Sequence, residues 1–293
     1  MANPVCLSPL KFYDSVAKQC HRKSYAHGHI APLITKLQFI PPFQFVIPEV
    51  LYTAGSNLGS AYLVDVQTDQ RVSANLATKL IETGFKVIDC EGYKVTIYPG
   101  HLPIQLEKEG QFYLELISSQ GLVWRYYSEV FCLTNSTYNC LEIEYWNETG
   151  NFKLKNGVIA FPDNFHFKLL LDSEVGKPEY NFEEEGTRRL GYNFIESQVS
   201  KKIYRFNTIL PEFICDAMRI IRLCDNKVIR SNEDEYDALT FEMSVDWQTQ
   251  GDLASVTCEF ETDNIIANFG GFRRDSLRGG DYNSDYNNDY SNQ

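Results

Sequence analysis

The sequence predicts a mainly β fold of the β-sandwich or β-barrel kind, with one or two short helices and two β-rich domains. Three observations support this. Tyr and Phe number 18 and 19, and aromatic residues are enriched in strands. Short β-branched and aromatic runs recur along the chain, among them SAYLVDVQ, QFYLELIS and LEIEYWN. Glycine or proline separates several runs, as at Gly92, Pro99 and Gly110, which is typical of sandwiches and barrels.

The charge balance argues against two classes of partner. The chain has 27 Lys and Arg against 39 Asp and Glu, a net charge of −12. Nucleic-acid binding needs basic surface, and an anionic membrane would repel this protein. The N-terminus has no apolar core of signal-peptide length, and no run approaches the roughly 18 apolar residues of a membrane span. We therefore expect no specific nucleic-acid binding, no membrane association and synthesis in a cytoplasm.

The first half of the chain contains an N-terminal arm and one domain. Residues 1–30 form the arm, which is locally basic because Lys11, Lys18, Arg22 and Lys23 face only Asp14. It is either an extension packed on the surface or an arm that docks on an acidic neighbour. Residues 31–135 are predicted to be a β-sandwich-like domain, in which SANLATKLIETG forms a short helix.

The second half is predicted to be another β-rich domain over residues 136–268. It has a helix at 210–223, where Pro211 and Glu212 suit the first turn. It also has a charged insertion at 173–193, which contains NFEEEGTRRLG. This connection exceeds the roughly 2–5 residues of a hairpin loop, so we expect a solvated loop that projects from the body or forms a lobe.

Residues 269–293 are predicted to be a disordered C-terminal tail. Asp-Tyr recurs at 281, 285 and 289, and no aliphatic residue follows Leu277. Such a segment cannot bury enough apolar surface to fold alone. The alternative is a segment that becomes ordered on binding, with its tyrosines as anchors.

No pattern in the chain indicates catalysis, a metal or a cofactor. The histidines and cysteine of CHRKSYAHGH lack standard zinc spacing, and no G-x-S-x-G, P-loop or G-x-G-x-x-G is present. Glu142 and Glu144 share one face of a strand, as do Glu259 and Glu261, whereas glycoside hydrolysis needs carboxylates that face each other. We therefore expect no enzyme activity.

The charged segments are candidates for protein contacts instead. Charged groups in an interface set register and partner choice more than affinity. The candidates for a subunit interface are Glu183, Glu184, Glu185, Arg188, Arg189, Lys11, Arg22 and Lys23. The candidates for docking near the tail are Arg273, Arg274 and Arg278.

Three groups of segments carry a resemblance to a known family. They are CLSPLKFYDS…CHRKSYAHGHIAPLI…PPFQF, then WRYYSEVF, and then SKKIYRFNTILPEFICDAMRIIRL followed by WQTQGDLASVTCEFETDNII. Their order, over residues 5–268, resembles tail or neck structural proteins of phages of Bacteroides-type bacteria, including the ring proteins of crAss-like phages. The resemblance implies a virion protein without enzyme activity, assembled in the host cytoplasm as a ring around the tail channel. Its partners would be copies of itself and adjacent tail or portal proteins.

A second function remains open. A β-sandwich that binds glycans or a receptor, on a virion or a cell surface, would use exposed aromatic rings. Trp124, Trp146 and Trp247 are the candidates for stacking on sugars, although a tryptophan in a small β-domain is commonly a core residue.

Overall fold

The computed structural model confirms the mainly β fold. It describes residues 10, 12–14, 33–36, 39–40, 43–48, 58–83, 85–90, 93–98, 102–104, 106–118, 125–135, 140–148, 151–154, 157–160, 166–189, 192–247 and 253–268. Within these residues nearly every element is a strand, and the few helices are short. The expected tail at 269–293 and most of the expected N-terminal arm lie outside the described residues.

A ten-stranded sheet forms the centre of the body. Its order is β1-β10-β9-β11-β2-β15-β12-β18-β19, with β5 paired to β9 off this path. The strands are β1 (Phe12–Asp14), β10 (Arg125–Ser128), β9 (Gly110–Ser118), β11 (Phe131–Thr134), β2 (Leu33–Lys36), β15 (Phe167–Asp172), β12 (Cys140–Trp146), β18 (Asn226–Ser231), β19 (Asp234–Asp237) and β5 (Leu58–Asp65).

Two further sheets complete the body. The five-stranded sheet has the order β13-β14-β6-β7-β4 and the two-stranded sheet pairs β3 with β8. These strands are β13 (Asn151–Leu154), β14 (Gly157–Ala160), β6 (Phe85–Cys90), β7 (Tyr93–Tyr98), β4 (Phe43–Pro48), β3 (Phe39–Ile40) and β8 (Leu102–Pro103). Both larger sheets take strands from before and after residue 135, so the two halves of the chain share sheets.

The short strand β2 joins the two halves of the ten-stranded sheet. On one side it pairs in parallel with β11, from Leu33 opposite Phe131 to Lys36 opposite Thr134. On the other side it pairs antiparallel with β15, through Leu33 and Ile34. Leu33 is 2% exposed, so this N-terminal strand is also part of the core.

The core follows from the alternation of side chains along the strands. On β12, Leu141, Ile143 and Tyr145 are buried in the main cluster, while Glu142 and Glu144 point to the other face. On β9, residues 112–116 are all buried, because a second cluster covers the far face. That cluster consists of Val64, Val66, Tyr113, Tyr127 and Val130.

Part of the expected N-terminal arm belongs to this body. Leu10 is fully buried, and β1 pairs with β10, with Phe12 opposite Ser128. The description of residues 1–30 as one surface arm is therefore wrong for Leu10 and β1, because the Leu10 side chain is buried in the core and β1 pairs in the ten-stranded sheet.

The two predicted helices are present but differ in their bounds. Helix α2 (Ala77–Thr83) lies within the predicted stretch, and the Asn75 side chain caps it by accepting the Ala77 amide at 3.0 Å. Helix α3 (Glu212–Met218) covers only half of 210–223, and a 3-10 turn η2 (Ile221–Leu223) follows. Pro211 ends a strand, and the Ile220 amide bonds the Ala217 carbonyl, three residues back, so the α-helix stops there.

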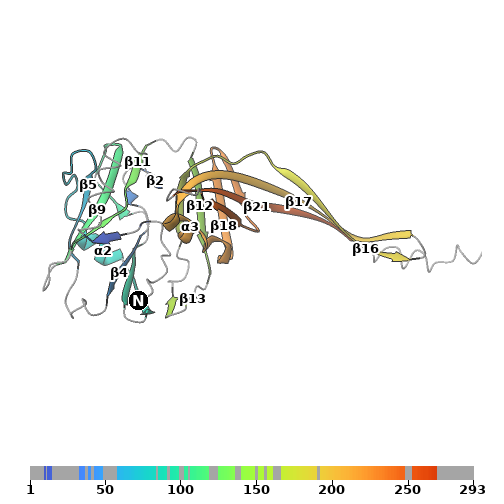
Figure 1. The fold of residues 1–293 in the computed structure, drawn as a ribbon, viewed down its shortest axis with the longest axis horizontal. Helices are drawn as coiled ribbons and strands as arrows, with labels where there is room; N and C mark the ends of the chain where they lie inside the picture. The colour runs from blue at the N-terminus through green and yellow to red at the C-terminus, as the bar shows by residue number, and fades with distance from the viewer. Residues whose placement is uncertain are drawn as a thin grey trace, which may run out of the picture.

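A four-stranded sheet of order β16-β17-β21-β20 lies beside the body. It consists of β16 (Glu179–Arg189), β17 (Tyr192–Pro211), β21 (Leu253–Asn268) and β20 (Glu242–Trp247). Figure 1 shows that the long strands leave the body together and extend far from it. We call the projecting part the β-ribbon: β16, residues 192–202 of β17 and residues 261–268 of β21.

Candidate functional site

The predicted interface acids lie in the β-ribbon. Glu183, Glu184 and Glu185 belong to β16, where they are opposite Val199, Gln198 and Ser197 of β17. The prediction that this stretch projects is correct, but the prediction of a loop is wrong. Residues 179–189 and 192–203 form a continuous ladder with one register shift, between Glu185 and Gly186. A β-bulge beside a glycine lets the ladder continue.

The structure places the predicted basic residues only in part. Arg188 and Arg189 lie in β16, with their backbones opposite Asn193 and Tyr192, but their side chains are outside the described residues. So are Lys11, Arg22, Lys23, Arg273, Arg274 and Arg278.

Residues of β17 hold the three acids in place. Lys201 Nζ donates to Glu183 Oε1 at 2.7 Å, and Gln198 Nε2 donates to Glu184 Oε1 at 2.7 Å. The Ser197 hydroxyl donates to Glu185 Oε2 at 3.4 Å. Exposed pairs of this kind contribute only about 0–1 kcal/mol, so they orient the carboxylates more than they stabilise the fold.

The β-ribbon also exposes large apolar side chains, which the sequence analysis missed. Phe182 is 73% exposed and Ile265 is 70% exposed. Both are opposite Ser200 on β17, on either side of it, so they lie on one face of the ribbon. Ile266, opposite Val199, is 63% exposed on the other face. The signals in the sequence were the Tyr180-x-Phe182 alternation and the adjacent Ile265 and Ile266.

The base of the same sheet is different. Tyr204, Phe206 and Leu210 of β17 are buried in the main core. Arg205 bridges the strands where the ribbon begins, with Nη1 at 2.6 Å from Glu179 Oε1 and Nε at 2.7 Å from Glu259 Oε1. One end of β17 is therefore anchored in the body, while the other carries apolar groups into solvent.

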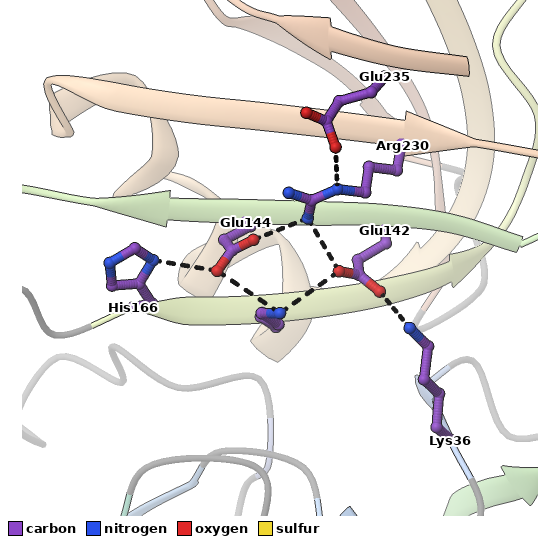
Figure 2. A network of polar contacts seen from close by, with 7 residues as sticks. Lys36, Glu142, Glu144, His166, Arg230 and Glu235 are labelled. Carbon is purple, nitrogen blue, oxygen red and sulfur yellow. Dashed lines mark hydrogen bonds and ion pairs between the residues drawn. The ribbon is translucent and has the colours of Figure 1, made fainter. Parts of the chain in front are cut away.

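A second polar cluster lies on the ten-stranded sheet. Figure 2 shows Arg230 of β18 between two carboxylates of β12, with Nη1 at 3.1 Å from Glu142 Oε1 and 2.7 Å from Glu144 Oε2. Its Nε lies 2.5 Å from Glu235 Oε2 on β19. Lys36 Nζ from β2 approaches Glu142 Oε2 at 2.9 Å.

Two further side chains contact the two acids. Lys168 Nζ lies 3.6 Å from Glu142 and 3.5 Å from Glu144, and His166 Nδ1 lies 3.0 Å from Glu144 Oε1. Burial raises the pKa of each carboxyl. For Glu142 the Lys36 hydrogen bond and the nearby cations outweigh burial, and for Glu144 the Arg230 hydrogen bond and Lys168 do so, so the pKa of each lies below its ordinary value.

This cluster therefore lacks the features of a catalytic acid pair. General acid catalysis needs a carboxyl with a raised pKa opposite a second carboxylate. Here both acids project from one face of β12, as the sequence predicts, and both have lowered pKa values. In the described part of the chain, no group of three or more His, Cys, Asp or Glu could hold a metal ion.

Two of the candidate sugar-stacking residues are described, and they lie in different sheets, Trp146 on β12 and Trp247 on β20. Trp146 stacks on the His166 ring with centroids 4.2 Å apart, and Trp247 is 46% exposed. Trp124 lies outside the described residues.

The comparisons with known proteins provide no relative from which a function could be inferred. No family model, curated protein or solved structure matches this chain. Among the described residues, no helix is long and apolar enough to cross a membrane.

Proposed function

We propose that this chain is a structural protein of a phage tail or neck, whose copies assemble as a ring around the tail channel. Adjacent tail or portal proteins would be its other partners, and the virion its location. The observation that carries the proposal is the β-ribbon, which extends from the body and exposes Phe182, Ile265 and Ile266 on its two faces. Phe182 and Ile265 flank Ser200 on one face, and exposed apolar side chains that lie together favour a protein contact.

The asymmetry of the molecule supports a ring over a simple dimer. A closed ring needs two unlike surfaces on each copy, because each subunit meets its neighbours head-to-tail. The body and the projecting β-ribbon are such a pair. The net charge of −12 agrees with a protein that lets DNA pass without binding it.

Electron microscopy and native mass spectrometry of the purified full chain test the proposal. We expect ring-shaped particles and a single multiple of the 33.7 kDa subunit mass. A strict monomer at all concentrations that binds host polysaccharide would instead support the glycan-binding alternative and overturn the ring.

A further inference from the structure

We infer that the β-ribbon of one copy receives the basic segment 15–32 of a second copy along the open edge of β16. This inference rests on the proposed ring and assigns the two surfaces that form its repeated contact. Three observations support it: the free edge of β16, the charges beside that edge, and the positions at which segment 15–32 enters and leaves the body.

The edge of β16 is long enough for a further strand to pair along it. Strand β16 is 11 residues long and lies at the end of the order β16-β17-β21-β20. In the part of the chain that the structure describes, its outer side pairs with no strand. The backbone donors and acceptors of such an edge are a template on which an extended segment of another chain adds as a strand.

The charges beside this edge favour a basic partner. Glu183, Glu184 and Glu185 are consecutive on β16 and repel any strand that brings acids opposite them. Glu183 is paired with Lys201, whereas the bonds of Glu184 and Glu185 come from the uncharged Gln198 and Ser197. Within the described residues, two carboxylates thus have no cation beside them. A basic partner would supply those charges.

One segment of the chain has the required composition. Residues 15–32 contain Lys18, Arg22 and Lys23 and no acid, a net charge of +3. The C-terminal segment 269–293 has three arginines but four aspartates, a net charge of −1. Charge complementarity therefore selects segment 15–32 rather than the C-terminal segment.

The position of this segment makes the contact one between copies. Its two ends continue from β1 and β2, both paired in the ten-stranded sheet, so it starts and finishes at the body. The β-ribbon extends away from that body (Figure 1). A ribbon that reaches the body of the next copy repeats around a ring, because donor and acceptor surfaces differ.

The apolar face adjoins the same edge and adds contact area. Phe182 is on β16 itself, and Tyr180, two residues away on the same strand face, is 60% exposed. Segment 15–32 offers Val16, Tyr25 and Ile30 to cover them. Exposed aromatic residues of this type are the usual anchors of an interface.

A charge exchange on the full-length chain tests the inference. The variants are Glu184→Lys with Glu185→Lys, and Arg22→Glu with Lys23→Glu, and both keep the Glu183–Lys201 pair. We expect each pair of changes to weaken ring formation about tenfold or more, and the combination of all four to restore it. Native mass spectrometry over a concentration series measures the dissociation constant, and thermal melting should not change.

An apolar change with a matched control provides the second arm. Phe182→Ser should abolish rings. Ile209→Ser should leave them intact, because Ile209 is also exposed, at 60%, but lies at the base of the four-stranded sheet, outside the β-ribbon. Rings that persist in the Phe182 variant and in both charge pairs would overturn the inference while the proposed function stands. Rings lost only on deletion of 269–293 would assign the edge to that segment instead. A wild-type chain that never assembles would overturn the proposed function itself.

Discussion

Arg230 shows how a sheet can bury two neighbouring carboxylates without making them reactive. Its guanidinium contacts Glu142, Glu144 and Glu235 on two strands. The side chains of Glu142 and Glu144 are only 11% and 13% exposed, and unpaired buried charge is costly. Arg230 lies directly opposite Glu142 and diagonal to Glu144 across the two strands, so one guanidinium pairs with both buried charges. The network therefore stabilises this face of the sheet in the charged state.

This network predicts a specific pH dependence. Folding lowers the pKa of Glu142 and Glu144, so the unfolded state binds protons more readily. The stabilisation is complete above the ordinary pKa of 4.5 and is lost as the pH falls through that value toward the folded pKa. Urea unfolding between about pH 3 and 7 should show a steeper acid loss for the wild type than for the Glu142→Gln, Glu144→Gln variant. Parallel curves would contradict the role of these two acids.

The cysteines give a second prediction at this scale. Cys215, Cys224 and Cys258 are buried as free thiols. Burial, with the charge of Asp216, raises the pKa of Cys215 to about 11, and burial raises that of Cys224 to about 12. At pH 8 the thiolate of Cys215 is then about 100-fold scarcer than that of an ordinary thiol. Mass spectrometry after maleimide labelling should show Cys215 and Cys224 unmodified until urea unfolds the chain, and rapid labelling in the native state would contradict this.

Among the elements, the ones that bury a face were predictable and the β-ribbon was not. The stretches QFYLELIS and LEIEYWN became β9 and β12 because their alternation fits a core face. EYNFEEEGTRR has the charge of a solvated loop, and its strand conformation depends on the ladder with β17 rather than on a core. Sequence also cannot show that Lys36 meets Glu142, 106 residues away, because a local pattern does not specify a partner.

Strand β2 provides the prediction at the scale of elements. Leu33 is 2% exposed and lies between β11 and β15. Leu33→Ala should lower the free energy of unfolding by about 2–5 kcal/mol, because it leaves a cavity where two half-sheets meet. Leu223→Ala, at a position that is 64% exposed, is the control and should change it by within about 0.5 kcal/mol. Urea denaturation measures both, and similar small losses would contradict the structural role of β2.

For the whole molecule, composition predicts the fold class but does not predict how the halves are interwoven. The boundary at residue 135 falls between β11 and β12, which belong to one sheet. The five-stranded sheet likewise combines β6 with β14. Hydrophobic periodicity indicates that strands exist, while their order depends on contacts between distant segments.

Assembly of the whole molecule should depend on the charges of the β-ribbon. Arg188→Glu with Arg189→Glu changes the charge near the end of β16, in the β-ribbon, so melting should be nearly unchanged. We expect tighter assembly in this variant, because it places two more acids on the strand whose edge receives the basic segment 15–32. We expect weaker wild-type assembly at high salt, because screening reduces exposed charge interactions. Sedimentation velocity at low and high salt measures both. Equal assembly of the variant and the wild type would remove these two arginines from the interface.

The position of β2 in the middle of its sheet also constrains the order of folding. One neighbour, β11, begins at residue 131, and the other, β15, begins at residue 167. A strand made early by the ribosome must therefore wait until more than a hundred further residues have emerged. Such long-range closure makes folding slow and leaves edges open to wrong pairing in the meantime. During synthesis, the N-terminal strands of this chain would consequently have to be kept from pairing with wrong strands until residue 172 has left the ribosomal exit tunnel.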